Sequence, residues 1–212
     1  MKIAAVGGSY FHIKKEGIME VNIYLFDDFE ALDAFGPASV FGKNPKDFHI
    51  NYVSANGNIV NSMQGLKVWT EPAVPEEMDG ILIIPGGRGA RRLLYQDTEI
   101  IKLLKRMASR SEICMMVSNG SALLSQTGLL YRRKIAGCGL DENWKRMFMA
   151  GIYIVDKAKW IADGKFYSSA ESLSGIAMSL SLVADQTGPE LAEQIAEQIG
   201  YEWSPEAEDV YL

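Results

Sequence analysis

Two short, unbroken apolar runs constrain the fold of this chain more than any other feature. Residues 81–84 (Ile-Leu-Ile-Ile) are bounded by Asp79 and Pro85, and residues 113–117 (Ile-Cys-Met-Met-Val) run directly into Ser118. Strands that are apolar at every position are typical of parallel sheets covered on both faces. A parallel pair of strands needs a crossover connection, which is usually a helix. The two runs therefore predict an α/β fold.

The rest of the chain continues this alternation of strands and helices. Residues 98–110 place apolar side chains three and four positions apart, which is the helical spacing. The same reading predicts strands at residues 21–26, 49–54, 59–60, 66–69, 153–155, 160–162 and 165–168, and helices at 30–41, 172–184 and 189–199. Strands that alternate with helices imply βαβ units. We expect a three-layer sandwich, with a mostly parallel sheet and helices on both faces.

The chain has 212 residues and shows no linker, internal repeat or low-complexity tract, so residues 19–212 are predicted to form a single domain. Residues 1–18 do not join the alternating pattern and are interpreted as an N-terminal extension, with an extra edge strand as the alternative. Their apolar stretch is too short for a secretory signal, whose core spans about 7–15 residues.

Composition narrows the choice of partners. The net charge of −6 argues against nucleic acid and anionic membranes, and the apolar runs are far shorter than the roughly 20 residues of a membrane span. Of the two cysteines, Cys114 lies inside a predicted core strand, so no disulfide is expected and a cytoplasmic location fits best. No metal-ligand spacing exists, and neither a metal nor a cofactor is predicted. The partner expected is a small-molecule ligand.

Three polar turns follow predicted strands: Asp27–Asp28, Pro85–Gly87 and Ser118–Asn119. In open α/β sheets, ligands bind beyond the carboxyl ends of the strands. The sequence therefore predicts one ligand site, at this edge of the sheet.

Ser118 occupies the tight turn between an apolar strand and a helix of small residues, which is the arrangement of a nucleophile elbow. Gly120 fits this interpretation, because a helix that starts beside a strand needs a residue without a side chain at the contact. The alternative is that Ser118 caps the helix. The earlier turn, with Gly86 and Gly87, leaves backbone N–H groups uncovered, so Gly87 and Asn119 are candidate donors to an oxyanion; the alternative is a tight turn alone.

Two further side chains are candidates for chemistry. Asp33 has apolar neighbours on its helix, which favours burial, a raised pKa and a role as general base. The alternative is an exposed helix carboxylate. Cys138 lies between Gly137 and Gly139, about twenty residues beyond the elbow, which suggests a tight backbone near the site; the alternative is a small apolar core residue.

Together these motifs resemble the ThiJ/PfpI family, in the class I glutamine-amidotransferase-like superfamily. Residues 32–37 (Leu-Asp-Ala-Phe-Gly-Pro) resemble its acidic helix motif, residues 84–87 (Ile-Pro-Gly-Gly) its oxyanion loop, and residues 118–121 (Ser-Asn-Gly-Ser) align with its elbow Cys-Thr-Gly-Ala. The resemblance spans residues 21–184 and implies a flavodoxin-like fold, Asp33, Gly86, Gly87, Asn119 and Gly120 as site residues, and a homodimer.

Two departures from the family pattern bear on function. Ser118 stands where the family has its nucleophilic cysteine, and Cys138 stands where it often has histidine. A helix dipole contributes only about 1 kcal/mol, which cannot ionise a serine, so Ser118 needs an adjacent base. No histidine follows it in the chain, and Asp33 is the candidate.

Three function hypotheses remain open. The first is a retained elbow pocket that binds a small carbonyl- or amide-type ligand, or is catalytically vestigial. The second is a hydrolase or hydratase, of the amidase or isonitrile-hydratase type, in which Ser118 acts with Asp33 as acid/base and Cys138 is a relocated thiol. The third is an interaction module.

Overall fold

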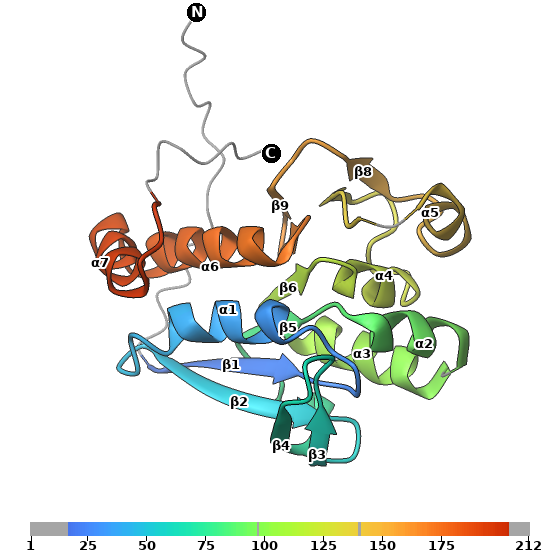
Figure 1. Cartoon of the computed structure of the whole chain (residues 1–212), viewed down its shortest axis with the longest axis horizontal. Helices are drawn as coiled ribbons and strands as arrows, with labels where there is room; N and C mark the ends of the chain where they lie inside the picture. Colours follow the sequence, from blue (N-terminus) through green and yellow to red (C-terminus); the bar gives the residue numbers. More distant parts are fainter. Residues whose placement is uncertain (1–16, 97, 140, 204–212) are drawn as a thin grey trace, which may run out of the picture.

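The computed structural model describes residues 17–96, 98–139 and 141–203, and Figure 1 shows its elements. The strands are β1 (Met19–Tyr24), β2 (Phe48–Ser54), β3 (Asn58–Asn61), β4 (Lys67–Pro72), β5 (Ile81–Ile84), β6 (Ile113–Val117), β7 (Lys134–Ala136), β8 (Tyr153–Val155), β9 (Trp160–Asp163) and β10 (Phe166–Ser169). The helices are α1 (Ala31–Phe41), α2 (Arg88–Gln96), α3 (Thr98–Arg110), α4 (Gly120–Ser125), α5 (Glu142–Phe148), α6 (Ser172–Thr187) and α7 (Pro189–Ile199), with a 3₁₀ turn at Pro75–Glu77.

Eight strands form one sheet in the order β3-β4-β2-β1-β5-β6-β10-β9. The interior pairs, from β4–β2 to β6–β10, are parallel, and only the edge strands β3 and β9 run antiparallel to their neighbours. Helices α1, α6 and α7 gather on one side of the sheet and α3 lies on the other (Figure 1). The predicted three-layer α/β sandwich is confirmed.

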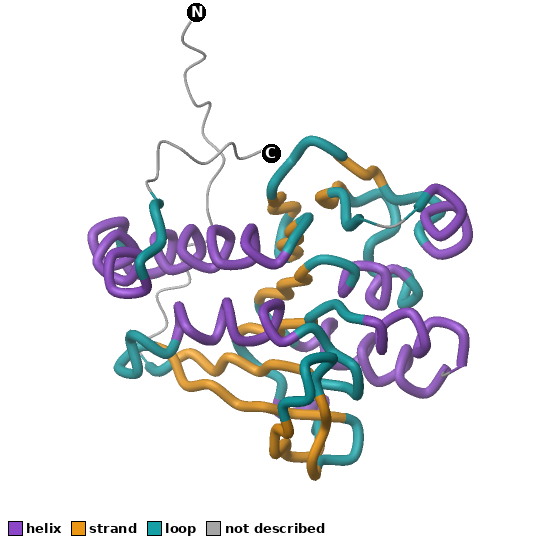
Figure 2. Tube along the Cα trace, viewed as in Figure 1, coloured by secondary structure: helices purple, strands orange, loops and turns teal. Residues whose placement is uncertain are grey.

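The central strands are as deeply buried as their composition predicted. All four residues of β5 are fully buried, and every residue of β6 is buried as well. Figure 2 shows these strands as a layer enclosed by helices. Because β1, β5 and β6 are parallel neighbours, their carboxyl ends open at one edge of the sheet. The predicted polar turns therefore lie at the same edge.

Three elements were not predicted: α2, α5 and β7, which pairs in a small second sheet with the predicted strand β8. Helix α2 begins immediately after the glycine turn. Its first residues are mostly arginine and glycine, which do not show the apolar spacing of a helix. Helix α5 has a recognisable start, because Asp141 accepts hydrogen bonds from the N–H groups of Asn143 and Trp144. Strand β7 has only three residues, too few to show periodicity. Among the described residues, no helix combines the length and apolar character that crossing a membrane requires.

Candidate functional site

The site residues predicted from sequence meet in one pocket of about 440 Å³ at the carboxyl edge of the sheet. Its wall includes Asp33, Gly87, Ser118, Asn119 and Cys138. The other lining residues are Glu30, Met63, Arg88, Arg91, Gly139, Ala170, Glu171 and Ser172. Segments from six separate parts of the chain therefore build this pocket, which we call the elbow pocket.

Ser118 has the strained backbone expected of an elbow. Its φ is +52°, in the left-handed region that non-glycine residues rarely adopt, and its N–H donates to the carbonyl of Ser169 on β10 at 3.0 Å. Helix α4 begins right after the turn, where a Cβ on Gly120 would overlap the carbonyl oxygen of Ile84. This contact between helix and strand therefore requires a residue without a side chain.

The Ser118 hydroxyl has no hydrogen-bond partner among the described residues. The N-terminal cap of α4 is Asn119, and no side chain bonds to the first helical N–H groups. The alternative in which Ser118 caps the helix is therefore not what the structure shows. The hydroxyl also makes no hydrogen bond to Asp33, so it is a polar group of the pocket wall without an assembled general base.

Asp33 lies on α1 and is buried, being 1% exposed, so the exposed-carboxylate alternative is wrong. Its Oδ2 accepts a 2.9 Å hydrogen bond from the Gly86 N–H, while Oδ1 has no hydrogen-bond partner among the described residues. Burial raises the pKa of Asp33 to about 6, although the nearby Ser172 hydroxyl and the Gly86 N–H lower it; the charge of Glu30 raises it slightly. The carboxyl group can therefore gain or lose a proton close to neutral pH.

The glycine turn holds both Asp33 and Asn119. A Cβ on Gly86 would overlap Asn119 Oδ1 and come within 2.7 Å of Asp33 Oδ2. The N–H of Gly87 donates to Asn119 Oδ1 at 2.8 Å, and Asn119 Nδ2 donates back to the Gly87 carbonyl at 3.1 Å. In this structure the Gly87 N–H is thus already used by Asn119, and it can reach a ligand only if that side chain turns away.

The two cysteines have different environments. Cys114 is fully buried within β6, as predicted, and burial raises its pKa to about 12. Cys138 is 2% exposed, contacts Met149 with an Sγ–Sδ distance of 3.8 Å, and lines the elbow pocket. The structure therefore places one thiol in the core and one in the pocket wall.

Charged side chains of both signs surround the pocket. Arg88 and Arg91 line it, with the Arg91 guanidinium 5.0 Å from the ring centre of Trp144. Arg92 instead forms an ion pair with Asp28 at 2.8 Å. Among the described residues no three His, Cys, Asp or Glu side chains gather as a metal site requires.

No sequence pattern indicated that two of the lining residues, Met63 and Ser172, belong to the site. Met63 belongs to the β3–β4 hairpin, which reaches the pocket because the Met63 N–H donates to the Phe29 carbonyl and the Arg88 N–H donates to Met63 Sδ at 3.3 Å. Ser172 starts α6, so the register of this helix against β10 decides its position. Neither contact follows from local sequence.

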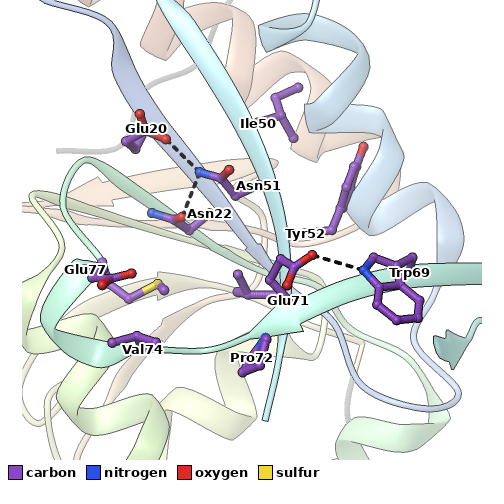
Figure 3. Close-up of a pocket in the computed structure, with 12 residues that line it drawn as sticks. Glu20, Asn22, Ile50, Asn51, Tyr52, Trp69, Glu71, Pro72, Val74 and Glu77 are labelled. Carbon is purple, nitrogen blue, oxygen red and sulfur yellow. Dashed lines mark hydrogen bonds between the residues drawn. The ribbon is translucent and has the colours of Figure 1, made fainter. Parts of the chain in front are cut away.

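A second hollow, of about 530 Å³, lies away from the elbow pocket, between β2 and β4 (Figure 3). Several of its polar side chains are engaged with one another. Asn51 Nδ2 donates to Glu20 at 2.7 Å and to Asn22 at 3.2 Å, and Trp69 donates to Glu71 at 3.0 Å. None of the side chains of this hollow carries a buried polar atom without a partner, whereas Asp33 Oδ1 in the elbow pocket does. The elbow pocket is therefore the stronger candidate site.

Comparison with known proteins shows a family match over most of the chain. Residues 19–185 match the model of the DJ-1/PfpI family. The isonitrile hydratase of Pseudomonas putida is 23% identical over 194 residues, which cover 88% of this chain and 80% of that protein.

Solved structures share the fold. A ThiJ/PfpI family protein from Pseudomonas syringae superposes with a TM-score of 0.76 at 22% identity, over 95% of this chain and 84% of the other. Drosophila melanogaster DJ-1beta superposes with a TM-score of 0.73 at 14% identity, over 88% and 100%.

Proposed function

Because the chain belongs to the DJ-1/PfpI family, we propose that its elbow pocket binds a small carbonyl- or amide-type ligand without a thiol nucleophile at the elbow. The segments that resemble the family's elbow and oxyanion loop lie at this edge of the sheet, and Ser118 stands where the resemblance predicts cysteine. A serine hydroxyl is a poor nucleophile unless a base removes its proton.

One observation carries this proposal: the elbow pocket contains a buried polar atom that the described residues leave unsatisfied. Asp33 Oδ1 is buried without a partner, and the half-buried Ser118 hydroxyl in the same pocket forms no hydrogen bond with a described residue. Such groups are rare in protein interiors unless water or a ligand satisfies them. A ligand with one hydrogen-bond donor and one acceptor, as in an amide, complements this set.

A second candidate function is hydration of a small molecule, with Asp33 as acid/base. It is favoured by the pKa of about 6 at Asp33 and by the likeness to an isonitrile hydratase. A carboxyl group with that pKa can donate a proton to the substrate and accept one from water near neutral pH. In this reading Ser118 positions the water or the substrate beside Asp33.

An activity panel of esters, amides, isonitriles and methylglyoxal separates the two functions. We would assay the wild type, Ser118→Ala, Ser118→Cys and Asp33→Asn, with Ser109→Ala on the exposed end of α3 as the control. The binding function predicts turnover by Ser118→Cys alone. Turnover by the wild type that is lost in Asp33→Asn but retained in Ser109→Ala would contradict the binding function and support the hydratase function.

Binding itself is tested by thermal shift with propionamide, the simplest amide probe. We expect the probe to raise the Tm of the wild type and to lose most of this effect in Asp33→Asn, which cannot accept a hydrogen bond at the same atom without rearranging. An equal shift in the two proteins would place the ligand elsewhere.

A further inference from the structure

Arg91 brings to the wall of the elbow pocket a positive charge that no carboxylate of the described residues neutralises. It lies in the first turn of α2, and its guanidinium forms neither an ion pair nor a hydrogen bond with a described residue. The neighbouring Arg92 is paired with Asp28 at 2.8 Å, and Arg88, the other arginine of the pocket wall, lies 3.9 Å from the same carboxylate. The charge of Arg91 is therefore available to a ligand.

A cluster of aromatic rings supports this guanidinium. It lies 5.0 Å from the ring centre of Trp144 on α5. The Trp144 ring packs in turn on Tyr95 of α2 and on Phe148, with ring centres 5.1 and 4.9 Å apart. A guanidinium stacked on a ring is held in place while the N–H groups at its edge stay free to donate. The cluster therefore connects α2 to α5 and fixes the position of the charge beside the pocket.

Asp33 supplies the second, independent observation in the same pocket wall. Its Oδ1 is buried without a partner among the described residues, while Oδ2 accepts the hydrogen bond from the Gly86 N–H. A buried carboxylate oxygen in this state needs a hydrogen-bond donor. The pocket thus offers an acceptor and a separate positive charge, and its volume of about 440 Å³ has room for a ligand that contacts both.

We propose that the ligand of the elbow pocket is a small carboxylate that also carries an amide, with Arg91 binding its carboxylate and Asp33 accepting a hydrogen bond from its amide nitrogen. The inference rests on the proposed function, because it takes the elbow pocket as the ligand site. It goes further in naming the charge of the ligand and in making Arg91 the residue that determines specificity. Arginine suits this role because its planar guanidinium can donate two parallel hydrogen bonds to one carboxylate.

Two glutamates share the pocket wall with Arg91 and oppose an anionic ligand. Glu30 already accepts hydrogen bonds from the Gln64 side chain at 2.7 Å and from the Leu32 N–H at 3.4 Å. The Glu171 carboxylate has no partner among the described residues, so its negative charge repels the carboxylate of the ligand. Glu171→Gln should therefore bind the anionic ligand more tightly than the wild type does, and a neutral ligand equally well.

Isothermal titration calorimetry near neutral pH, with a matched pair of probes, tests the inference. Succinamate and succinamide have nearly the same shape, but only succinamate carries a carboxylate. We expect the wild type to bind succinamate about tenfold more tightly, which is the scale of a hydrogen bond to a charged group. Arg91→Gln should lose this preference while its affinity for succinamide stays the same. Arg92→Gln is the control: it removes the same charge from the next residue and should keep the preference.

Trp144 is a positioning residue in this proposal, and the aromatic cluster offers its control. Trp144→Leu should reduce the preference for succinamate about threefold, because Arg91 loses its support, and should leave the affinity for succinamide unchanged. Phe148→Leu removes another ring of the same cluster and should keep the full preference. A full preference in Trp144→Leu would contradict the positioning role of Trp144.

Two results of the calorimetry would overturn the inference. One is a preference for succinamate that survives in Arg91→Gln. The other is a preference that Arg92→Gln loses to the same extent, because the effect would then come from the overall charge of α2 rather than from a contact in the pocket. Circular dichroism checks that each variant remains folded.

The neutral probes separate this inference from the proposed function. If propionamide and succinamide bind the wild type but succinamate binds no more tightly than succinamide, the assignment of Arg91 is wrong and the ligand site stands. If none of the three probes binds, the proposed function fails as well.

Discussion

The burial that raises the pKa of Asp33 also makes its ionised form unfavourable in the folded protein. Its folded pKa of about 6 lies above the ordinary value of 3.8, so the native state binds the proton more tightly than the unfolded chain does. This group therefore contributes stability below pH 3.8, and the contribution is lost as the pH rises through 6. A shift of about two units corresponds to about 3 kcal/mol.

We predict that Asp33→Asn becomes progressively more stable than the wild type as the pH rises. Asparagine keeps an oxygen for the Gly86 N–H but never ionises, so the difference in unfolding free energy should grow by about 2.5 kcal/mol between pH 4 and pH 7.5. Urea unfolding of both proteins at each pH measures it. A difference that stays constant with pH would mean that Asp33 titrates normally in the folded protein.

Ser118 carries a backbone cost of its own. At a φ of +52°, any residue with a Cβ is strained by roughly 1 kcal/mol relative to glycine. We predict that Ser118→Gly is more stable than Ser118→Ala by about that amount, the reverse of the order at a helical position. Denaturant unfolding of the two variants decides this, and a more stable alanine variant would contradict the elbow geometry.

At the scale of elements, the contact of α4 with β5 depends on Gly120. A Cβ there would meet backbone atoms, with the carbonyl oxygen of Pro85 at 2.9 Å, and backbone cannot move aside as a side chain can. We predict that Gly120→Ala loses 2 kcal/mol or more, an overpacking cost of the order of 1–3 kcal/mol. It should also abolish ligand binding by displacing Ser118.

The matched control for this substitution is Gly36→Ala, another glycine inside a helix. Its Cβ would lie 3.1 Å from Ile176 Cγ1, the flexible part of a side chain, so the cost should be small and alanine's better helix propensity offsets part of it. Thermal unfolding measures both variants. Similar losses of stability would contradict the prediction that the backbone contact makes Gly120 the more sensitive position.

Local sequence predicted some of these elements and missed others for definable reasons. The helices at 98–110 and 189–199 have the predicted bounds, because their apolar spacing repeats over three turns. The burial of Asp33 followed from its apolar neighbours on α1. The pairing of Asn119 with Gly87 could not be predicted, because it depends on two turns from different strands meeting with one particular side-chain orientation.

At the scale of the whole molecule, the sheet order explains why so much of the site was predictable. Strands β1, β5 and β6 are adjacent and parallel. The residues that come directly after each of them therefore lie close together, although they are far apart in the sequence. The hairpin that brings Met63 and the loop that carries Cys138 lie outside this repeating arrangement. Their approach to the pocket depends on tertiary packing, which no motif encodes.

The homodimer implied by the family resemblance stays a prediction. Ile59 on β3 and Trp69 on β4 lie directly opposite each other, yet both are exposed, at 54% and 62%. Neighbouring apolar side chains on an edge hairpin favour contact with another protein surface. A second copy of this chain would bury such a patch against itself around a two-fold axis.

Analytical ultracentrifugation tests this prediction directly. The wild type should sediment at twice the chain mass at micromolar concentration, and Trp69→Lys should shift it toward the monomer, because burying an unpaired ammonium in an apolar contact is costly. Tyr131→Lys, at an equally exposed aromatic residue after α4, is the control that should remain dimeric. A monomeric wild type would refute the dimer, whereas a Trp69→Lys protein that stays dimeric would move the interface away from the hairpin.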